Sequence, residues 1–495
     1  MKNIETDIIV VAGGVAGLAS AIAAAEKGAR VIIFEKATTT GGTGNMGMGP
    51  FAVESTLQRR KQVDLSKERA FKLFMDYTHW QVDALLVRAY IEKSADTIDW
   101  LEKMGVEFAH VSANFLGSYA TWHVVKPEVG PPGPGSASTM LKKMTIRAKE
   151  LGVQIFLRTP VKEVTKKENK ISGVIAEGES GETIQATARA VIIATGGFGN
   201  NPHMIKKYTG YEWGRTIFSA RIPGIDGDGI RMAWEAGAVQ DKMNMELTHG
   251  MPFMVSDPTS SSGPGGLPYE FATFRQPNLM VNLQGERFMN EEVLSNTTFT
   301  GNAIARQKDG CAFNIFSGHT KSHFQEHGLD FLFPTHPGSS LDNLDETIQQ
   351  VINQGYKHVF IADSLKELAI GTGIDSDGLR KTVEDYNWFC EIGHDDLFHK
   401  SHKYLRPIKG PKFYAGRNFP MGYGSLGGIK INHKAEVVTK NHDVIAGLYA
   451  AGTDACSIFA DSYFFILPGN TMGFALNSGR IAGEHASKYS KQNGK

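Results

Sequence analysis

The chain has few cysteines, no excess of either charge and no apolar run longer than a strand. Its three cysteines, Cys311, Cys390 and Cys456, are far apart and form no CxxC pair, which argues against disulfides, structural zinc and attached c-type haem. Because 52 basic side chains balance 52 acidic ones, neither nucleic acid nor an anionic membrane is expected as the main partner. We expect a protein with no metal site and no membrane insertion.

The beginning of the chain has no features of a secretory signal. Residues 1–11 run directly into an apolar strand, without a basic segment, an apolar core and a small-residue cleavage site, so we expect a cytoplasmic protein. A length of 495 residues is too great for one ordinary core and predicts two domains, or one large α/β domain with an insertion. The 55 glycines indicate many backbone turns that approach a ligand.

The N-terminal segments follow the order of a dinucleotide-binding βαβ unit, which is strand, glycine turn, small-residue helix, second strand and acid. The expected segments are residues 7–11, 12–17, 18–27, 29–34 and Glu35. A glycine turn alone can have a purely structural role. With strand, helix and acid all in register, a nucleotide site is the better interpretation.

Three residues of this unit have a definite physical task. Gly14 lets a pyrophosphate approach the helix N-terminus, Gly17 lets helix and strand pack closely, and Glu35 accepts hydrogen bonds from ribose hydroxyls. Ala12 stands where the first glycine of the motif is usual, so the turn requires a backbone angle there that an L-residue tolerates. The other expected nucleotide-binding residues of this unit are Gly13, Val15, Ala16 and Lys36.

Three later segments indicate that the dinucleotide is FAD. A loop rich in glycine and hydroxyl groups, residues 38–49, suits a cofactor that continues beyond its pyrophosphate. Residues 190–194 form a buried strand that ends in an ATGG sequence, and residues 447–454 form another strand and turn with an acid placed for the ribityl chain. The expected FAD residues are Gly41, Gly42, Thr43, Gly47, Met48, Gly49, Thr195, Gly196, Gly197, Gly452 and Asp454.

With these motifs the chain resembles the flavoprotein family of fumarate reductase, the succinate dehydrogenase flavoprotein, urocanate reductase and the 3-ketosteroid dehydrogenases. The resemblance covers nearly the whole chain and includes matching motifs at residues 227–229, 281–291, 427–429 and 478–483. It implies an α/β fold with a Rossmann-like FAD-binding domain in two segments and an inserted α+β capping domain that closes over the reactive face of the flavin. The implied bounds are 1–249 and 425–495 for the FAD-binding domain and 250–424 for the capping domain.

The resemblance also implies how FAD is held. No histidine follows the loop 41–49 where covalently flavinylated relatives carry one, so non-covalent FAD is expected. A helix over residues 471–486 would point its positive end at the N1/O2 edge of the flavin, although Asn470 is equally explained as a helix cap. The remaining implied cofactor residues are Val161, Asp228, Gly469, Asn470, Thr471 and Met472.

In this family the flavin passes a hydride from N5 to an activated alkene, or takes one in reverse, but the charges of the fumarate reductases are missing here. Their proton-donor arginine falls on Ser295, their clamping arginine on Ile466, and one histidine near Tyr423 and Gly424. Of these charged groups, only the histidine that opens the capping domain has a counterpart in this chain, His249. Because a buried unpaired carboxylate costs several kcal/mol, fumarate is disfavoured as a substrate.

The side chains that remain suit a flat, neutral, ring-containing substrate. The ketosteroid dehydrogenases use a tyrosine and a backbone N–H at the position of Gly469, but two of their tyrosine positions fall on Ser295 and Phe465. The candidate substrate residues are Tyr119, Tyr463, Phe464, Phe465, Ile466 and Gly469.

The candidate catalytic residues are Tyr423, His249, Ser295 and Arg275. Tyr423 is the favoured general acid, although a packed tyrosine explains this position equally well. Arg275 lies near the family's proton-relay arginine, but its spacing is off by one residue and favours a surface position. His123 beside Trp122 is a weaker site candidate.

The leading hypothesis is an FAD-dependent reductase, an ene-reductase of fumarate reductase type, acting on the C=C bond of a cyclic or aromatic small molecule such as an enone, a ketosteroid or an isoflavonoid-like compound. A 3-ketosteroid-type dehydrogenase running the reverse reaction is one alternative, and a non-catalytic flavin-binding electron-transfer protein is another. No second dinucleotide turn is evident, so either NAD(P)H or another external electron donor fits the sequence.

Overall fold

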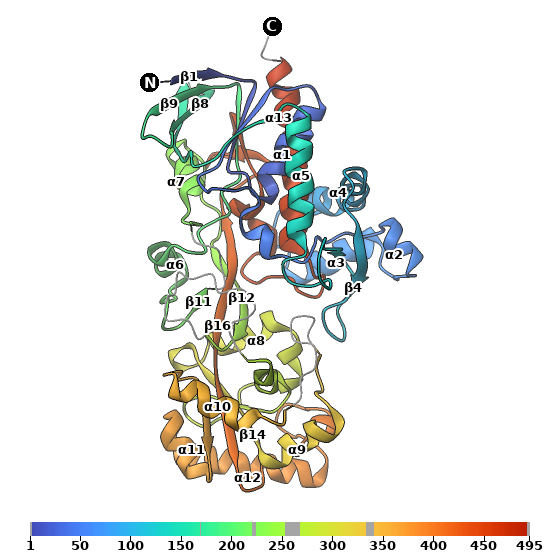
Figure 1. The fold of residues 1–495 in the computed structure, drawn as a ribbon, viewed down its shortest axis with the longest axis vertical. Helices are drawn as coiled ribbons and strands as arrows, with labels where there is room; N and C mark the ends of the chain where they lie inside the picture. Colours follow the sequence, from blue (N-terminus) through green and yellow to red (C-terminus); the bar gives the residue numbers. More distant parts are fainter. Residues whose placement is uncertain (1, 169, 220–223, 253–267, 333–340, 493–495) are drawn as a thin grey trace. The chain divides into compact units, whose positions relative to one another are not determined.

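The computed structural model describes the chain except residues 1, 169, 220–223, 253–267, 333–340 and 493–495 (Figure 1). It is a mixed α/β protein, as the sequence predicts, and it divides into two compact units. The first unit consists of Met1–Gly210, Arg221–Glu246 and Gly424–Lys495, and the second unit of Tyr211–Ala220 and Leu247–Tyr423.

The first unit is built on a six-stranded sheet with the order β17-β18-β10-β2-β3-β6. The strands from β18 to β6 are parallel, and β17 is antiparallel to β18. All residues of β2 and β10 are buried, which explains why both strands are continuous apolar runs. The strands are β2 (Ile8–Val11), β3 (Val31–Phe34), β6 (Gln154–Phe156), β10 (Ala190–Ile193), β17 (Glu436–Val438) and β18 (Val444–Ala450).

Two smaller sheets complete the strands of this unit. One has the order β1-β9-β8-β7 and the other is the pair β4-β5, while the short strand β19 pairs with the end of strand β16 (Phe413–Gly428). These strands are β1 (Lys2–Glu5), β4 (Phe108–Ser112), β5 (Trp122–Val125), β7 (Val161–Lys167), β8 (Lys170–Glu177), β9 (Thr183–Thr187) and β19 (Ala455–Cys456).

Helices α1, α5 and α13 of the first unit lie side by side (Figure 1). Small residues permit the close contact of α1 with α13: a Cβ atom on Gly479 would lie 2.5 Å from the carbonyl oxygen of Ala16, and one on Gly483 would lie 2.2 Å from that of Ser20. The helices of this unit are α1 (Val15–Glu26), α2 (Thr56–Arg60), α3 (Lys67–Tyr77), α4 (Ala84–Lys103), α5 (Ala137–Glu150), α6 (Pro202–Thr209), α7 (Asp228–Glu235) and α13 (Asn470–Gln492).

Helix α13 is longer than the sequence predicts. It begins one residue earlier than the expected range 471–486 and continues to Gln492. The extension follows the buried face, which runs on through Ser487 and Ser490. No helix in the described ranges combines the length and apolar character that crossing a bilayer requires.

The second unit has a sheet in which β14 pairs with β13 and β16, and β16 also pairs with β15, all antiparallel, whereas β11 pairs with β16 in parallel. That pairing explains why residues 211–220 belong to this unit, although the resemblance implies that they are part of the first FAD-binding segment. The elements are β11 (Phe218–Ser219), β12 (Asn244–Gly250), β13 (Leu279–Val281), β14 (Ala312–Ser317), β15 (Val359–Ala362), β16 (Phe413–Gly428), α8 (Thr297–Ala305), α9 (Gly318–His327), α10 (Leu344–Asn353), α11 (Leu365–Thr372) and α12 (Ser376–Ile392). The first three residues of β12 and the last five of β16 belong to the first unit.

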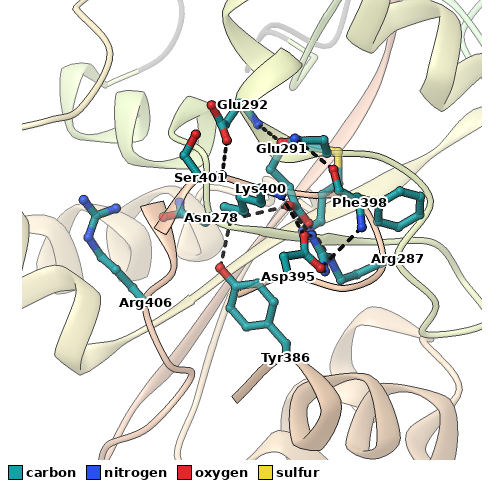
Figure 2. Close-up of polar contacts among 12 residues, drawn as sticks. Asn278, Arg287, Glu291, Glu292, Tyr386, Asp395, Phe398, Lys400, Ser401 and Arg406 are labelled. Carbon is teal, nitrogen blue, oxygen red and sulfur yellow. Dashed lines mark hydrogen bonds and ion pairs between the residues drawn. The ribbon is translucent and has the colours of Figure 1, made fainter. Parts of the chain in front are cut away.

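A buried charge cluster links distant segments of the second unit (Figure 2). The Arg287 guanidinium donates to both oxygens of Glu291, at 2.9 and 2.8 Å, and to both oxygens of Asp395, at 3.0 and 2.9 Å. Lys400 Nζ lies 3.4 Å from Glu291 Oε2 and donates to the Tyr386 hydroxyl at 2.8 Å. These side chains join the motif at 281–291 to the segment after α12 and fix the start of the turn that carries Ser295.

Candidate functional site

The predicted nucleotide turns meet at one edge of the six-stranded sheet. Strands β2, β10 and β18 are parallel neighbours, so the turns that follow their carboxyl ends lie together, where open α/β sheets bind ligands. Glu35, at the end of β3, accepts from the backbone N–H of Gly13 at 2.7 Å and of Ala37 at 2.7 Å. The structure therefore brings the first glycine turn and the predicted ribose acid into contact.

Asp454 holds the turn of the ATGG sequence, residues 194–197, in place by hydrogen bonds. Its buried carboxylate accepts from the backbone N–H groups of Gly196 at 3.1 Å and Gly197 at 2.9 Å, and from the Thr195 hydroxyl at 2.9 Å. Burial raises the pKa of Asp454, and these hydrogen bonds oppose that rise. The carboxylate thus fixes the turn after β10 from the neighbouring strand, and its contact with a ribityl chain stays a prediction.

Two observations indicate that the glycine-rich loops can bind FAD. A Cβ atom on Gly14 would have no neighbour within 4 Å, so the N-terminus of α1 is open to an approaching phosphate. The hydroxyl oxygen of Thr43 is buried and has no hydrogen-bond partner within the described ranges, as expected for a group that a ligand satisfies. Both residues were predicted to hold the cofactor.

The backbone at Ala12 differs from the expectation. Its φ of 82° lies in the left-handed region, which costs a non-glycine residue about 1–2 kcal/mol. The reason is the tight turn before α1, in which the carbonyl oxygen of Ala12 approaches Gly17 so closely that a Cβ atom there would lie 1.9 Å away. The turn is therefore strained at the position where the motif usually has glycine.

Other predicted cofactor residues are also placed by contacts within the first unit. The Lys36 ammonium pairs with Asp228 at 2.7 Å and with Asp226 at 3.3 Å, so two predicted cofactor positions bind each other. Val161 is the buried first residue of β7. A Cβ atom on Gly47 would lie 2.4 Å from the methyl group of Met472, which places the second glycine loop against the start of α13.

Asn470 holds the segment before α13 in place. Its amide nitrogen donates to the carbonyl oxygens of Phe464 at 2.8 Å and Leu467 at 2.5 Å, and its side-chain oxygen accepts from the Tyr90 hydroxyl at 2.7 Å. The side chain thus binds the preceding loop and α4, which differs from the helix cap considered from the sequence. Tyr90 carries no local signal of this role, since it is 380 residues away.

The aromatic substrate candidates divide into a core part and a partly exposed part. Phe464 is 1% exposed and packs on Phe74 and Tyr77, with ring centroids 5.0 and 4.5 Å apart, so this predicted substrate residue belongs to the core. Phe465 is partly exposed and lies beside Trp122, at 6.4 Å between centroids. Phe464 is therefore part of the hydrophobic core, whereas the neighbouring ring of Phe465 is partly accessible to a substrate.

Tyr119, Ile466 and Gly469 are the other substrate candidates of this region. The backbone N–H of Tyr119 donates to the carbonyl oxygen of Ile466 at 2.9 Å, so two predicted substrate segments lie together. Gly469 has a φ of 89°, and a Cβ atom there would lie 2.7 Å from the backbone nitrogen of Phe51, so only glycine fits without movement.

His123 has a structural role and is not a site residue. Its Nδ1 lies 3.0 Å from the carbonyl oxygen of Thr121 and its Nε2 lies 2.6 Å from the Ser55 hydroxyl, so both ring nitrogens are occupied. Burial lowers the pKa of His123 to about 4. The imidazole is neutral and ties the start of α2 to β5.

His249, in the second unit, is a buried histidine with unmet hydrogen bonds. Its side chain is 3% exposed, and neither ring nitrogen has a partner of hydrogen-bond geometry in the part of the chain described. Burial, and then the charge of Arg275, lowers the pKa of His249 to about 3, against a smaller opposing effect of the Thr297 backbone. A neutral imidazole with two unused nitrogens is suited to binding a polar ligand group.

The other candidates of this unit have different surroundings. Burial lowers the pKa of Arg275 to about 10 and its Nε is enclosed, so the surface position favoured from the sequence is wrong. The hydroxyl of Ser295 donates to the carbonyl oxygen of Glu292 at 3.3 Å, within its own turn. Tyr423 is 43% exposed, which makes it more exposed than the packed tyrosine that was the alternative.

The lowered pKa of His249 predicts an acid-sensitive fold. The unfolded imidazole binds a proton below about pH 6.5 but the folded one only near pH 3, so stability falls as the pH drops between these values. His249 should account for about 2 kcal/mol of the loss between pH 7 and pH 5. Urea unfolding at pH 7 and pH 5 measures the free energy of unfolding. His249→Gln should lack this loss of about 2 kcal/mol, whereas the control His394→Gln, at an exposed site, should keep it. If the stability of His249→Gln depended on pH as that of the unmodified protein does, the buried neutral imidazole would not be the cause.

Comparisons with known proteins agree with the geometry of the first unit. A family model described as FAD binding domain matches residues 7–470. The chain is 33% identical to the vinyl phenol reductase of Lactiplantibacillus plantarum over 99% of this chain and 98% of that protein. It is 29% identical to the cytochrome fumarate reductase of Shewanella frigidimarina, covering 98% and 78% of the two chains. The fold resembles 3-ketosteroid Δ1-dehydrogenase from Sterolibacterium denitrificans, with a TM-score of 0.78, 21% identity and 98% and 99% coverage.

Proposed function

Because the chain belongs to the FAD binding domain family and is an FAD-dependent oxidoreductase acting on carbon–carbon double bonds, we propose that it reduces the double bond of a neutral aromatic substrate of the 4-vinylphenol class. When bound, FAD supplies the hydride. The alkene gains this hydride at one carbon and a proton at the other, so one π bond is lost and two C–H bonds form.

The observation that carries this proposal is the aromatic and aliphatic surface before α13. Phe465 and Ile466 are partly exposed there, and Trp122 and Tyr119 adjoin them. Ile466 stands where the resemblance to fumarate reductases implies a clamping arginine. A flat apolar ring gains from this surface, whereas a carboxylate placed against Ile466 would lose hydration without the cationic side chain that the resemblance implies at that position. The likeness to a vinyl phenol reductase over almost the whole chain supports the same substrate class.

The chain's own groups have distinct proposed tasks. The glycine turns, Thr43 and Glu35 bind the cofactor, and the N-terminus of α13 offers positive potential to the negative charge that develops on reduction. In the second unit, neutral His249 and cationic Arg275 are the proposed polar contacts, and Tyr423 is the proposed proton donor. Electrons reach the protein from an external donor, either NAD(P)H or another carrier.

Stopped-flow reoxidation tests the proposal. The FAD-loaded protein is reduced anaerobically with dithionite, which bypasses the unknown donor, and then mixed with 4-vinylphenol or fumarate. We expect 4-vinylphenol to reoxidise the flavin at least about 100-fold faster than fumarate, because a lost charge clamp costs several kcal/mol.

Other outcomes separate the alternatives. Rapid reoxidation by fumarate would contradict the argument from Ile466. Bleaching of oxidised flavin by a saturated 3-ketosteroid would indicate the dehydrogenase, and a normal FAD content without any response would indicate the non-catalytic flavoprotein.

A further inference from the structure

A buried carboxylate lies at the beginning of α13. Glu246, in β12, is 4% exposed, and the hydroxyl of Thr471, which donates to this carboxylate, lies 3.0 Å from each of its oxygens. Thr471 is the second residue of α13, so an acid 225 residues away in the sequence is placed at the first turn of this helix. Both residues belong to the first unit. Because a helix N-terminus carries positive potential, this position favours the ionised form of Glu246.

The charge of Glu246 acts on a neighbouring group of the same turn. The backbone N–H of Thr471 donates to the hydroxyl oxygen of the buried Tyr463 at 3.3 Å. Burial, and then the charge of Glu246, raises the pKa of Tyr463 above its ordinary value, against smaller opposing effects of the hydrogen bonds with Thr471. The carboxylate therefore opposes the formation of a second negative charge at the beginning of α13.

The second glycine loop connects this turn with the N-terminus of α1. The backbone N–H of Gly41 donates to the carbonyl oxygen of Gly13 at 2.8 Å, so the loop starts beside the first glycine turn. Thr43, whose buried hydroxyl has no partner within the described ranges, comes next in the loop. A Cβ atom on Gly47 would lie 2.4 Å from the methyl group of Met472, in the first turn of α13. A long cofactor that binds along this loop would reach from the pyrophosphate site to the beginning of α13.

We propose that Glu246 lowers the reduction potential of the bound flavin. Reduction by two electrons with uptake of one proton leaves the flavin ring with a negative charge, which the helix N-terminus stabilises and a nearby carboxylate opposes. This inference rests on the proposed function in one respect, which is that the flavin adjoins α13. A lower potential also suits the proposed substrate: a vinyl group on a phenol lacks the electron-withdrawing carboxylates of fumarate, so its reduction requires a more strongly reducing flavin.

The midpoint potential of the bound FAD tests the role of Glu246 without any substrate. The holoprotein is titrated anaerobically with dithionite at pH 7 in the presence of a reference dye of known potential. Glu246→Gln keeps the size of the side chain and removes its charge. It should shift the equilibrium about tenfold toward reduced flavin, which is a rise of about 30 mV for a two-electron couple. The Kd of oxidised FAD, measured by flavin fluorescence, should stay within about threefold.

Two further variants separate the effect of charge from that of local structure. Glu246→Asp keeps the charge and shortens the side chain, so the equilibrium should stay within about twofold of the unmodified protein, or about 9 mV. Glu484→Gln makes the same chemical change about 20 Å farther along α13, at a partly exposed carboxylate that pairs with Lys93 at 2.7 Å. It should also stay within about twofold, because water and salt screen that charge.

An unchanged potential in Glu246→Gln would overturn the inference. An equal shift in Glu246→Asp or in Glu484→Gln would overturn it too, since the shape of the side chain or the total charge would then be the cause. So would the loss of oxidised FAD from Glu246→Gln, because Glu246 would then hold the cofactor site together. If the potential rises as expected but 4-vinylphenol does not reoxidise the flavin, the proposed function fails and the role of Glu246 stands.

Discussion

Replacing Arg287 by methionine should lower the free energy of unfolding by about 3–5 kcal/mol, because it leaves Glu291 and Asp395 as buried carboxylates without their common partner. The Arg287 and Glu291 side chains are 2% and 0% exposed, so water cannot take the place of the lost charge (Figure 2). Burial alone would raise the pKa of Asp395, but Arg287 and neighbouring backbone N–H groups hold it at about 2. Without Arg287 the Asp395 carboxylate should take up a proton on folding.

Urea unfolding at pH 7, followed by circular dichroism and by amide exchange in β13 and α12, measures this loss. Arg380→Met is the control, since Arg380 pairs with Glu384 at 2.9 Å on the exposed face of α12 and should leave the unfolding curve nearly unchanged. A small effect of Arg287→Met, close to that of the control, would show that the cluster does not hold the second unit together.

Two alanine substitutions in the first glycine turn should separate its packing role from its cofactor role. Gly17→Ala should destabilise the apoprotein by about 3 kcal/mol and abolish FAD binding, because the new Cβ atom would lie 1.9 Å from the carbonyl oxygen of Ala12. Gly14→Ala should leave the apoprotein as stable as before, since nothing lies within 4 Å of its Cβ position and its φ of −74° suits alanine. It should nevertheless weaken FAD binding at least about 10-fold, because the methyl group occupies the path of the pyrophosphate.

Flavin fluorescence quenching gives the Kd of FAD, and urea unfolding of the apoprotein gives the stability of each variant. Gly14→Ala is itself the control for Gly17→Ala, since the chemical change is the same three residues away. Full FAD affinity in Gly14→Ala would refute the placement of the pyrophosphate at the N-terminus of α1. An apoprotein that is equally stable with alanine at position 17 would refute the close approach seen in the structure.

The locally encoded elements could be predicted from the sequence with small errors at their ends. The βαβ unit can be recognised without a structure, because its glycine turn, its acid Glu35 and its apolar strands follow one another at fixed spacing within about thirty residues. The end of α13 was missed because its buried face continues through small polar residues, Ser487 and Ser490, that carry no apolar signal.

The environments of single side chains could not be predicted in the same way. Neighbouring aromatic residues look alike in the sequence, yet Phe464 fills the core and Phe465 is partly exposed. His123 and His249 are both buried, but the Thr121 carbonyl and the Ser55 hydroxyl satisfy the ring nitrogens of the first, whereas those of the second have no partner of hydrogen-bond geometry in the described ranges. The burial of Arg275 had no local signal either.

The sequence by itself determined the FAD cofactor, the family and the class of reaction, because the motifs that carry them are residue types at short spacing. The resemblance to that family also implies that the charge clamp is lost. Only the tertiary structure decided which groups meet: Arg287 with Asp395 over 108 residues, Asp454 with the turn after β10, and Thr471 with Glu246 over 225 residues. Such contacts depend on how strands and helices pack, and burial then sets the charge and hydrogen-bond demand of each group.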